Sequence, residues 1–359
     1  MKKIAYIVCN ISKVGGTERA VINIANTLSD YPEYEVTIIS MYSGKQDQAG
    51  MWLSEDVKIL HLGLNNSKQQ LLFSYVRFLK LMRSIDKKDE FDVVIGTTHA
   101  MNSLLSICVN RSKVVACEHT IYEACPFLSR VIRRIAYSRM DAVVLLTNSE
   151  AEKYSFVSPQ KKYVIPNALS FEIEIPSTLD NKIIVAAGRL SPVKRYDLLI
   201  DLASDIKVHL PDWEIRIYGD GECKQELQHR INEYGLESYV SLMGNTNKIA
   251  DILIDSSIMV MTSRYEGLPM ILIEGQACGL PIVSFDCPVG PRNIIDHNHN
   301  GYLISEGNNR EFVEKVVALA QNMKLRKTFG ENAYKASKKY DSKEVASQWL
   351  KMFEKISVA

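Results

Sequence analysis

Short apolar runs rich in β-branched residues alternate with longer segments of helical periodicity through the first half of the chain. A strand, a helix and a second strand are predicted in succession at residues 4–9, 18–28 and 36–40. Further apolar runs predict strands at residues 93–96, 114–117 and 142–146. Because strands that alternate with helices form parallel sheets, this half predicts a sheet with helices on both faces.

The alternation stops at Pro166 and Asn167 and resumes after a polar stretch that ends at Asp180. The second series predicts strands at residues 183–187, 214–218, 240–243, 258–262 and 282–285, and helices at residues 309–321, 325–340 and 342–356. The last helix carries an apolar face made of Val345, Trp349, Met352, Phe353 and Ile356. We therefore expect two α/β domains, at residues 1–167 and 168–340, and a terminal helix within residues 341–359.

The composition narrows the class of protein. A chain of 359 residues exceeds the roughly 250–300 residues at which a single core stops growing, which agrees with two domains. Its 43 basic and 42 acidic residues argue against general nucleic-acid binding. The sequence contains no run of about 18 apolar residues, so no membrane span is predicted. The seven scattered cysteines contain no Cys-x-x-Cys pair and indicate reduced thiols, so we expect a cytoplasmic protein.

The loops that follow strands are the candidate sites, because open parallel sheets bind ligands beyond the carboxyl ends of their strands. The first such loop contains Gly15 and Gly16 and leads into a helix with Thr17 as its expected N-cap. Glycine amides can approach a phosphate at a helix N-terminus. A plain strand-to-helix turn explains the same residues equally well, and the loop lacks the Gly-x-Gly-x-x-Gly fingerprint of dinucleotide sites.

Basic and glycine-rich loops follow the strands of the second half. Arg189 and Lys194 come after its first strand, where they could hold a diphosphate and stabilise the charge that develops as it leaves. Basic loops of this composition are more often simply exposed to solvent. Gly219 follows the next strand and favours a tight turn, and Asn245 follows the strand after that, where its backbone could contact a base.

Two glutamates eight positions apart follow the strand at residues 258–262. Glu266 lies in the loop, and Glu274 lies in the helix that this loop begins, where its neighbours are apolar and an unpaired carboxylate would be costly. Carboxylates of this kind can accept hydrogen bonds from the paired hydroxyls of a ribose. The alternatives are an acid favoured by the helix dipole for Glu266 and a surface position for Glu274.

These motifs together resemble the retaining glycosyltransferases of family 4, which have the GT-B fold of two Rossmann-like domains facing a cleft. The resemblance covers nearly the whole chain, and it implies that the C-terminal helix crosses back to the first domain. It rests on Glu266-x7-Glu274, Gly279-Leu-Pro281-Ile-Val283, Gly188-Arg189-x4-Lys194 and Gly15-Gly16-x2-Arg19. Two departures leave the donor specificity open, namely Arg195 in place of a common glycine and Gly275-Gln276 in place of Ala-Met.

The resemblance implies roles for single residues. It assigns Arg189 and Lys194 to the donor diphosphate, Glu274 to the ribose, and Glu266 to catalysis beside the sugar ring. The other donor contacts that it implies are Gly15, Gly16, Gly188, Gly219, Asn245, Gly267, Leu268 and Pro269. His119, just after a strand, is expected against the donor sugar, with a satisfied interior histidine as the alternative, and Arg19 and His99 are acceptor candidates.

The implied reaction retains configuration, with departure of the nucleoside diphosphate and attack by the acceptor on the same face. The resemblance implies a UDP-sugar donor, with glucose, galactose and their N-acetyl forms all open, and neither a metal nor another cofactor. In agreement, no Asp-x-Asp follows a strand of the first half. The two histidines within residues 296–301 could suggest a metal site, but the Asn-Gly pair there favours a turn.

Two basic stretches concern the acceptor. Residues 69–88 interleave apolar side chains with Arg77, Lys80, Arg83, Lys87 and Lys88, and residues 127–139 contain Arg130, Arg133, Arg134 and Arg139. Such stretches can lie on anionic membranes, and helices packed on the protein with a solvated basic face are an equal alternative. We expect a peripheral enzyme on the inner face of the cell membrane that extends an undecaprenyl-diphosphate-type lipid-linked glycan in cell-surface polysaccharide synthesis. A nucleotide-sugar epimerase or a non-catalytic nucleotide-sugar-binding protein would share the donor site.

Overall fold

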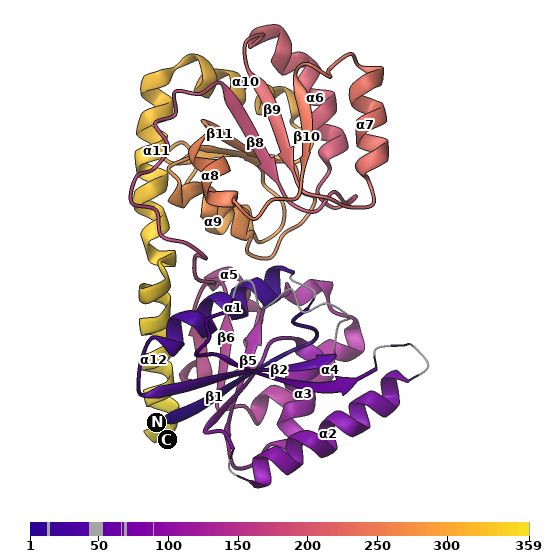
Figure 1. Cartoon of the computed structure of the whole chain (residues 1–359), viewed down its shortest axis with the longest axis vertical. Coiled ribbons are helices and arrows are strands. Elements are labelled where there is room, and N and C mark those ends of the chain that lie inside the picture. Colours follow the sequence, from indigo (N-terminus) through magenta and orange to yellow (C-terminus); the bar gives the residue numbers. More distant parts are fainter. Residues whose placement is uncertain (13–14, 43–52, 66, 68–69, 89, 359) are drawn as a thin grey trace. The chain divides into compact units, whose positions relative to one another are not determined.

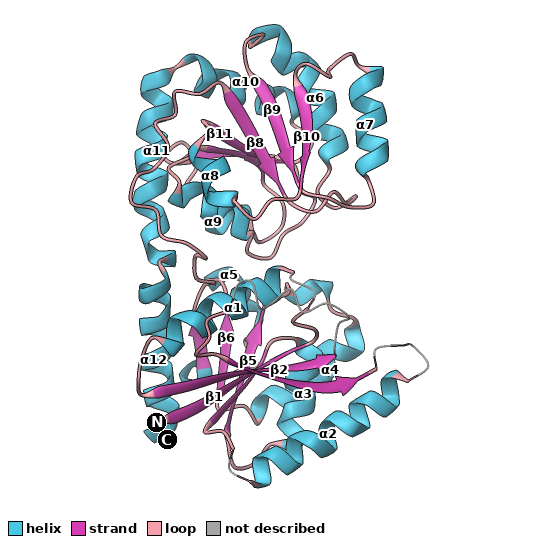
Figure 2. Cartoon of the chain, in the orientation of Figure 1, coloured by secondary structure: helices cyan, strands magenta, loops and turns pink. Residues whose placement is uncertain are grey.

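The computed structural model describes residues 1–12, 15–42, 53–65, 67, 70–88 and 90–358. The chain forms two compact units. Unit 1 contains residues 1–170 and 340–359, and unit 2 contains residues 171–339. Each unit is built on one parallel sheet with helices on both faces (Figures 1 and 2).

Within the described residues of unit 1, seven strands form the sheet in the order β3-β2-β1-β4-β5-β6-β7. Their bounds are β1 Lys2–Val8, β2 Tyr34–Tyr42, β3 Lys58–Leu64, β4 Val93–Gly96, β5 Lys113–Glu118, β6 Ala142–Leu145 and β7 Lys162–Val164. The helices are α1 Gly16–Ser29, α2 Leu71–Lys87, α3 His99–Cys108, α4 Phe127–Ser138, α5 Asn148–Lys153 and α12 Ser342–Val358. Short 3-10 turns lie at Tyr122–Ala124 and Pro159–Lys161.

The two faces of the first sheet bury different helices. Ile4, Tyr6 and Val8 of β1 share a core with α1 and α12, whereas Ala5 and Ile7 face a second core with α2 and α3. This alternation follows from the two-residue period of a strand. The terminal helix α12 lies beside α1 in this unit (Figure 1), and the Trp349 ring meets the Tyr6 ring edge-on, with centroids 5.8 Å apart.

Unit 2 has six strands in the order β10-β9-β8-β11-β12-β13. Their bounds are β8 Ile183–Ala187, β9 Glu214–Tyr218, β10 Val240–Gly244, β11 Ile258–Met261, β12 Ile282–Phe285 and β13 Gly301–Ile304. The helices are α6 Tyr196–His209, α7 Lys224–Glu233, α8 Ile249–Ile254, α9 Met270–Ala277, α10 Asn309–Gln321 and α11 Met323–Ser337, with 3-10 turns at Pro291–Asn293 and Lys338–Tyr340.

The predicted fold class, two doubly wound α/β domains, is confirmed, but the sequence pattern missed three strands. These are β3 and β7 at the two edges of the first sheet and β13 at an edge of the second. Exposed positions interrupt the apolar pattern of β3, β7 has three residues, and β13 begins at a turn glycine. Edge strands bury less of their surface, which weakens the apolar signal. In the described part of the chain, no helix has the length and apolarity to cross a membrane.

Each sheet reverses its strand order once, between β1 and β4 in unit 1 and between β8 and β11 in unit 2. In doubly wound sheets, the carboxyl ends of the two strands at such a switch point flank the ligand crevice. The loops after β1 and β4 contain Gly15 and lead to His99, and the loops after β8 and β11 contain Lys194 and Glu266. These four loops are therefore the candidate ligand-binding loops.

Candidate functional site

The loop after β8 is fixed by its neighbours through backbone hydrogen bonds. The amides of Gly188 and Leu190 donate to the carbonyls of Tyr218 and Asp220, each across 2.9 Å. Gly219 has a φ of +137°, and a Cβ atom there would lie 1.9 Å from the carbonyl oxygen of Gly188. Gly219 is therefore needed for the close approach of the two loops.

An ion pair joins the loops at the switch point of unit 2. The Lys194 ammonium lies 2.5 Å from a carboxylate oxygen of Glu266, and the two side chains are 20% and 14% exposed. The Thr262 hydroxyl lies 2.9 Å from the carbonyl oxygens of Lys194 and Arg195, and Arg195 adopts a left-handed φ of +52° before α6. These contacts hold a cation and an anion side by side at the carboxyl ends of β8 and β11.

Two features around this ion pair were not predicted from the sequence. Gly290, after β12, leaves room for Glu266, because a Cβ at Gly290 would lie 2.7 Å from the Cβ of Glu266. Tyr196 is buried, and its pKa is raised by burial and, to a smaller extent, by the charge of Glu266. The run Pro288-Val-Gly-Pro291 after a strand was the available signal for the first feature.

The remaining donor candidates of unit 2 surround this pair to different degrees. Arg189 is exposed, and among the residues that the structure describes no carboxylate forms an ion pair with its guanidinium. Gly267 is partly exposed, Leu268 is buried, Pro269 caps the start of α9, and Asn245 is exposed after β10. These positions leave cationic and amide groups accessible near the strand ends.

Glu274 lies inside α9 and is completely buried, with 0% exposure, so the alternative of a surface helix position is wrong. Its charge acts with burial to raise the pKa of Cys278 to about 12, burial being the larger cause. Because its carboxylate has no accessible surface here, contact with a ribose requires neighbouring side chains to move. The assignment of Glu274 to the ribose stays a prediction.

The glycine loop of unit 1 begins α1, with Gly15 rather than the expected Thr17 as the N-cap. The Gly15 amide donates to the Glu18 carboxylate across 3.2 Å. Burial raises the pKa of Glu18, although hydrogen bonds to the backbone amides of Glu18 and Gly15 oppose this shift. A side-chain anion therefore occupies part of the helix N-terminus at which a phosphate was expected. Arg19 follows it and is partly exposed.

His119 comes directly after β5, as predicted. Its Nε2 lies 3.4 Å from the Cys117 sulfur, and its Nδ1 is buried without a hydrogen-bond partner among the described residues. Burial lowers the pKa of His119 to about 4, so the imidazole is neutral at pH 7. The ring borders a small void that Tyr6 and Trp349 also line. The assignment of His119 to the donor sugar stays a prediction.

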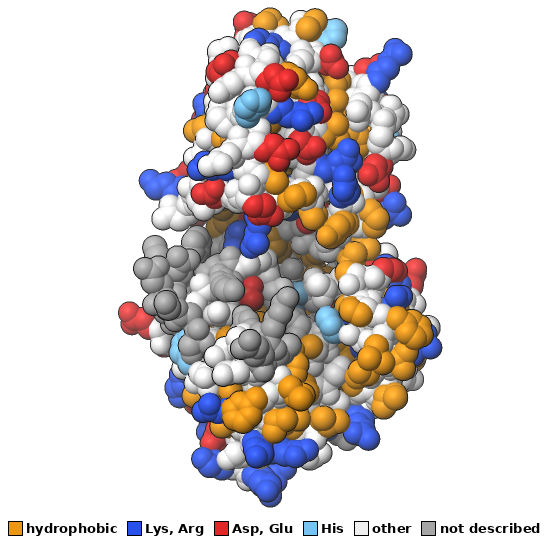
Figure 3. Space-filling view, turned by 90° about the vertical axis from the view of Figure 1, so that its right-hand side faces the viewer, with side chains coloured by type: hydrophobic (Ala, Val, Ile, Leu, Met, Phe, Trp, Pro, Cys, Tyr) orange, Lys and Arg blue, Asp and Glu red, His pale blue; other side chains and the backbone are white. Residues whose placement is uncertain are grey.

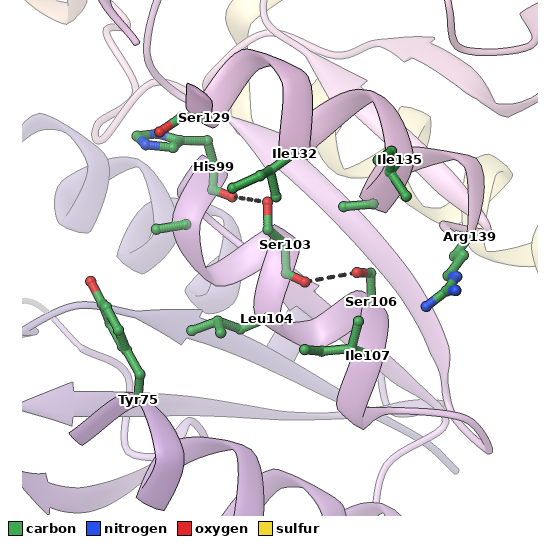
Figure 4. A pocket seen from close by; sticks show the side chains of 12 residues that line it. Tyr75, His99, Ser103, Leu104, Ser106, Ile107, Ser129, Ile132, Ile135 and Arg139 are labelled. Atoms are coloured by element: carbon green, nitrogen blue, oxygen red, sulfur yellow. Dashed lines mark hydrogen bonds between the residues drawn. The ribbon is translucent and has the colours of Figure 1, made fainter. Parts of the chain in front are cut away.

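His99 begins α3 and lies 3.5 Å, through Nδ1, from the sulfur of Cys125. Its pKa is lowered, chiefly by burial and secondly by the charge of Arg133. His99 borders one end of a groove between α3 and α4 (Figure 4). This position is compatible with an acceptor contact, which stays a prediction.

The expectation of a basic outer face on residues 127–139 is wrong for Arg133, which is completely buried. Its guanidinium lies 2.5 Å from the Tyr154 hydroxyl and 3.9 Å from the Glu118 carboxylate, and it lies over the Tyr122 ring. Burial raises the pKa of Glu118 to about 7, against the opposing effect of Arg133. Helix α4 therefore turns a charged group inward.

The exposed surface of α4 is mainly apolar and also carries Arg134. Its exposed apolar residues are Phe127, Leu128, Val131, Ile132 and Ile135, with exposed fractions between 41% and 76%. Figure 3 shows apolar side chains gathered on one face of unit 1, with Lys and Arg side chains at its lower end. Exposed apolar clusters are common at interaction sites.

No group of three or more His, Cys, Asp or Glu side chains suited to a metal ion occurs within the described residues. The two histidines of residues 296–301 belong to a turn, in which Asn298 has a φ of +65° and donates its amide to the carbonyl of Gly301. The Nδ1 of His297 accepts a hydrogen bond from the Leu303 amide. The expectation of a turn is confirmed.

Comparison with known proteins identifies two family models that together span most of the chain. The model described as Glycosyl transferases group 1 matches residues 171–336, and the model described as Glycosyltransferase Family 4 matches residues 14–172. The chain is 29% identical to an uncharacterized glycosyltransferase of Haemophilus influenzae, over 97% of this chain and 99% of that one. It is also 29% identical to the amylovoran biosynthesis glycosyltransferase AmsD of Erwinia amylovora, with the same coverage.

A third relative, from Campylobacter jejuni, is 24% identical over the full length of both chains. Its name describes an α-1,4-N-acetyl-D-galactosaminyltransferase that acts on a glycan linked to undecaprenol through a diphosphate. Among solved structures, TarM of S. aureus in complex with UDP has a TM-score of 0.82 at 18% identity, over 98% of this chain and 100% of that one. Anabaena HepE with UDP has a TM-score of 0.81 at 20% identity, over 99% and 100%. Both show the same fold.

Proposed function

The chain belongs to glycosyltransferase family 4, with the GT-B fold, and from this premise we propose that it transfers a hexosyl or N-acetylhexosaminyl group from a UDP-sugar to a glycan with retention of configuration. The observation that carries the proposal is the Lys194–Glu266 ion pair at the switch point of unit 2. Two of the relatives named above support a glycan acceptor, because one is named for amylovoran biosynthesis and the other for action on an undecaprenol-linked glycan.

Lys194 and Arg189 hold the donor diphosphate in this proposal. The bond between the sugar C1 and the diphosphate oxygen breaks, and the bond from C1 to an acceptor hydroxyl oxygen forms on the same face. The acceptor proton passes to the departing phosphate. The two cations stabilise the negative charge that builds on the leaving group, which is the largest contribution that preorganised groups usually make.

Glu266 and His119 complete the proposed chemistry. Glu266 turns from Lys194 to the sugar hydroxyls when the diphosphate takes its place beside the ammonium. The low pKa of His119 keeps its imidazole neutral, so it can accept or donate a hydrogen bond to a sugar hydroxyl without adding charge. No residue is required as a covalent nucleophile.

The experiment combines purified protein, each UDP-sugar and a lipid-linked glycan, with the new anomeric centre assigned by NMR. We expect release of UDP and a product with the anomeric configuration of the donor. A product of opposite configuration would overturn retention. Isomerised donor without UDP release would identify an epimerase instead.

We also propose that the acceptor is lipid-linked and that unit 1 contacts an anionic membrane. The apolar outer surface of α4 and the exposed cations of α2, among them Arg77 and Lys80, support this contact. Apolar insertion combined with cationic attraction is the usual way in which peripheral proteins bind anionic bilayers. The names of the Campylobacter jejuni relatives, which act on undecaprenyl-diphosphate glycans, support the class of acceptor.

Sedimentation with phosphatidylglycerol-containing vesicles tests this contact. Replacement of Arg77 and Lys80 by glutamate should weaken binding at least five-fold. The control replaces Lys224 and Lys324 of unit 2, both exposed, by glutamate, and binding should persist. Equal binding by both double variants would contradict the membrane contact. Arg133 is unsuitable for this test because it is buried.

A further inference from the structure

A groove of about 380 Å³ runs between α3 and α4, and Tyr75 of α2 closes one side (Figure 4). Its volume lies within the roughly 300–1,000 Å³ of small-molecule sites. Apolar side chains form most of the lining, with Leu104 and Ile107 on α3 facing Ile132 and Ile135 on α4. The groove therefore offers a concave apolar surface rather than a flat one.

The hydroxyl groups in the groove are used by the protein itself. The Ser103 hydroxyl donates to the carbonyl of His99 across 2.8 Å, and the Ser106 hydroxyl donates to the carbonyl of Ser103 across 2.7 Å (Figure 4). Hydroxyls bonded in this way along their own helix have less capacity to recognise a sugar. The long middle of the groove thus fits a hydrocarbon better than a glycan.

The two ends of the groove differ. One end, with His99 and Ser129, lies at the starts of α3 and α4, which follow the carboxyl ends of β4 and β5. The other end, with Ile107 and Arg139, lies about 12 Å away, since eight residues of α3 rise about 1.5 Å each. The first end faces the reacting edge of the sheet, and the second end faces away from it.

The charged side chain in the lining of the groove is a cation, Arg139. None of the twelve lining residues is acidic. Arg139 lines the far end, and the Arg83 guanidinium donates to the carbonyl of Ile107 there. An apolar groove that has no acidic lining and two helix starts at its near end is complementary to an amphiphile that has a hydrocarbon chain and an anionic head.

We infer that this groove binds the isoprenoid chain of a polyprenyl-diphosphate-linked acceptor, with the diphosphate toward His99 and Ser129. The inference rests on the proposed function, which supplies a lipid-linked acceptor. The isoprenoid chain enters between Ile107 and Ile135, which are 46% and 66% exposed and continue the apolar surface of α4. The attached glycan then lies at the carboxyl edge of the sheet.

The test measures binding of farnesyl diphosphate to the whole protein by isothermal titration calorimetry, below the concentration at which the probe forms micelles. Inorganic diphosphate and farnesol serve as the head alone and the chain alone. We expect farnesyl diphosphate to bind at least ten-fold more tightly than either fragment. Equal affinity for farnesyl diphosphate and inorganic diphosphate would overturn the inference.

A matched pair of variants on α4 locates the site. Ile132 lines the groove and Val131 does not, although they are 47% and 41% exposed. Ile132→Glu should weaken farnesyl diphosphate binding at least ten-fold, whereas Val131→Glu, which adds the same charge one position away, should change it less than two-fold. Equal losses would show that the probe binds the outer surface or the charge alone, and would overturn the groove site.

Ala100→Phe gives a third variant that fills the groove without adding charge, and it should also lose binding. Protection against thermal unfolding by UDP-sugars serves as a folding control and should be unchanged in all three variants. If wild-type protein binds farnesyl diphosphate but no UDP-sugar, the proposed transferase function is wrong. If it binds UDP-sugar but not farnesyl diphosphate, only the lipid groove is wrong.

Discussion

Lys194→Met removes the ammonium at the switch point of unit 2 and keeps most of the side-chain volume. The Lys194 side chain packs on Gly188, where a Cβ atom would lie 3.2 Å from its Cε, so methionine preserves that contact. The variant leaves the Glu266 carboxylate, 14% exposed, without its ion-pair partner. An unpaired, largely buried carboxylate costs about 1–3 kcal/mol, which sets the expected loss in the free energy of unfolding.

The loss of activity should be larger than the loss of stability. Removing one preorganised group that stabilises developing negative charge typically lowers kcat by about 10²–10³, or roughly 2.7–4 kcal/mol. Because the charge on the diphosphate grows as the bond to the sugar breaks, the effect should fall mainly on kcat rather than on KM for the donor.

Steady-state measurement of UDP release with the preferred donor separates these effects. Glu266→Gln and the double variant complete a thermodynamic cycle, and the two changes should be non-additive because the side chains are in contact. A Lys194→Met enzyme with wild-type kcat would refute the assignment of Lys194 to the leaving group. A matched loss in Lys207→Met, in the last turn of α6, would attribute the effect to general destabilisation.

Three further outcomes are expected. Burial raises the pKa of Glu118 from 4.5 to about 7, so the free energy of unfolding that Glu118 contributes is complete below pH 4.5 and falls by on the order of 3 kcal/mol as the pH rises to 7. Glu118→Gln should remove this dependence on pH from urea unfolding curves. His119 should affect stability in the opposite direction, because its lowered pKa of about 4 makes the free energy of unfolding fall as the pH drops from 6.5 to 4. The free energy of unfolding of His119→Asn should lack that fall. Gly219→Ala should cost about 3 kcal/mol or more of unfolding free energy, because its Cβ would collide with Gly188. Gly244→Ala should cost only about 1 kcal/mol, since its φ is +74° and no atom of the described residues lies within 4 Å of the added Cβ; equal costs would contradict the steric explanation.

The sequence predicted the location of Lys194 and Glu266 because two strong regularities coincide there. Parallel sheets expose their functional loops at the carboxyl ends of strands, and the apolar runs before each loop marked those ends. The contact between the two side chains depends on the strand order, since β8 and β11 are neighbours in space but lie far apart in the chain. The sequence pattern contains no direct record of that pairing.

Arg133 shows where the sequence pattern misleads. Helical periodicity separates the residues of α4 into faces, but it does not say which face meets the protein. Glu118, Tyr122 and Tyr154 form a polar and aromatic site for the guanidinium, and this site turns the apolar residues outward. These partners come from β5, the turn before α4 and the end of α5, so no local pattern could have shown the inversion.

The groove between α3 and α4 could not be predicted from the sequence, although His99, at one of its ends, was a predicted acceptor contact. Its lining combines residues of three helices at spacings that resemble ordinary core positions. The support of Glu266 by Gly290 depends likewise on a loop 24 residues away, whose glycine reads as a common turn. Geometry of this kind follows from packing rather than from periodicity.

The central claim is that the strand-end loops of unit 2 bind a UDP-sugar through Lys194. Thermal unfolding in the presence of a panel of nucleotide sugars tests it most directly, because a ligand that binds only the folded state stabilises it by about 2.7 kcal/mol at 100 times its Kd. For a unit of this size the predicted result is a rise of about 5–10 °C in Tm for one UDP-sugar, largely lost in Lys194→Met. The claim is contradicted if no UDP-sugar raises Tm, or if Lys194→Met retains the full rise.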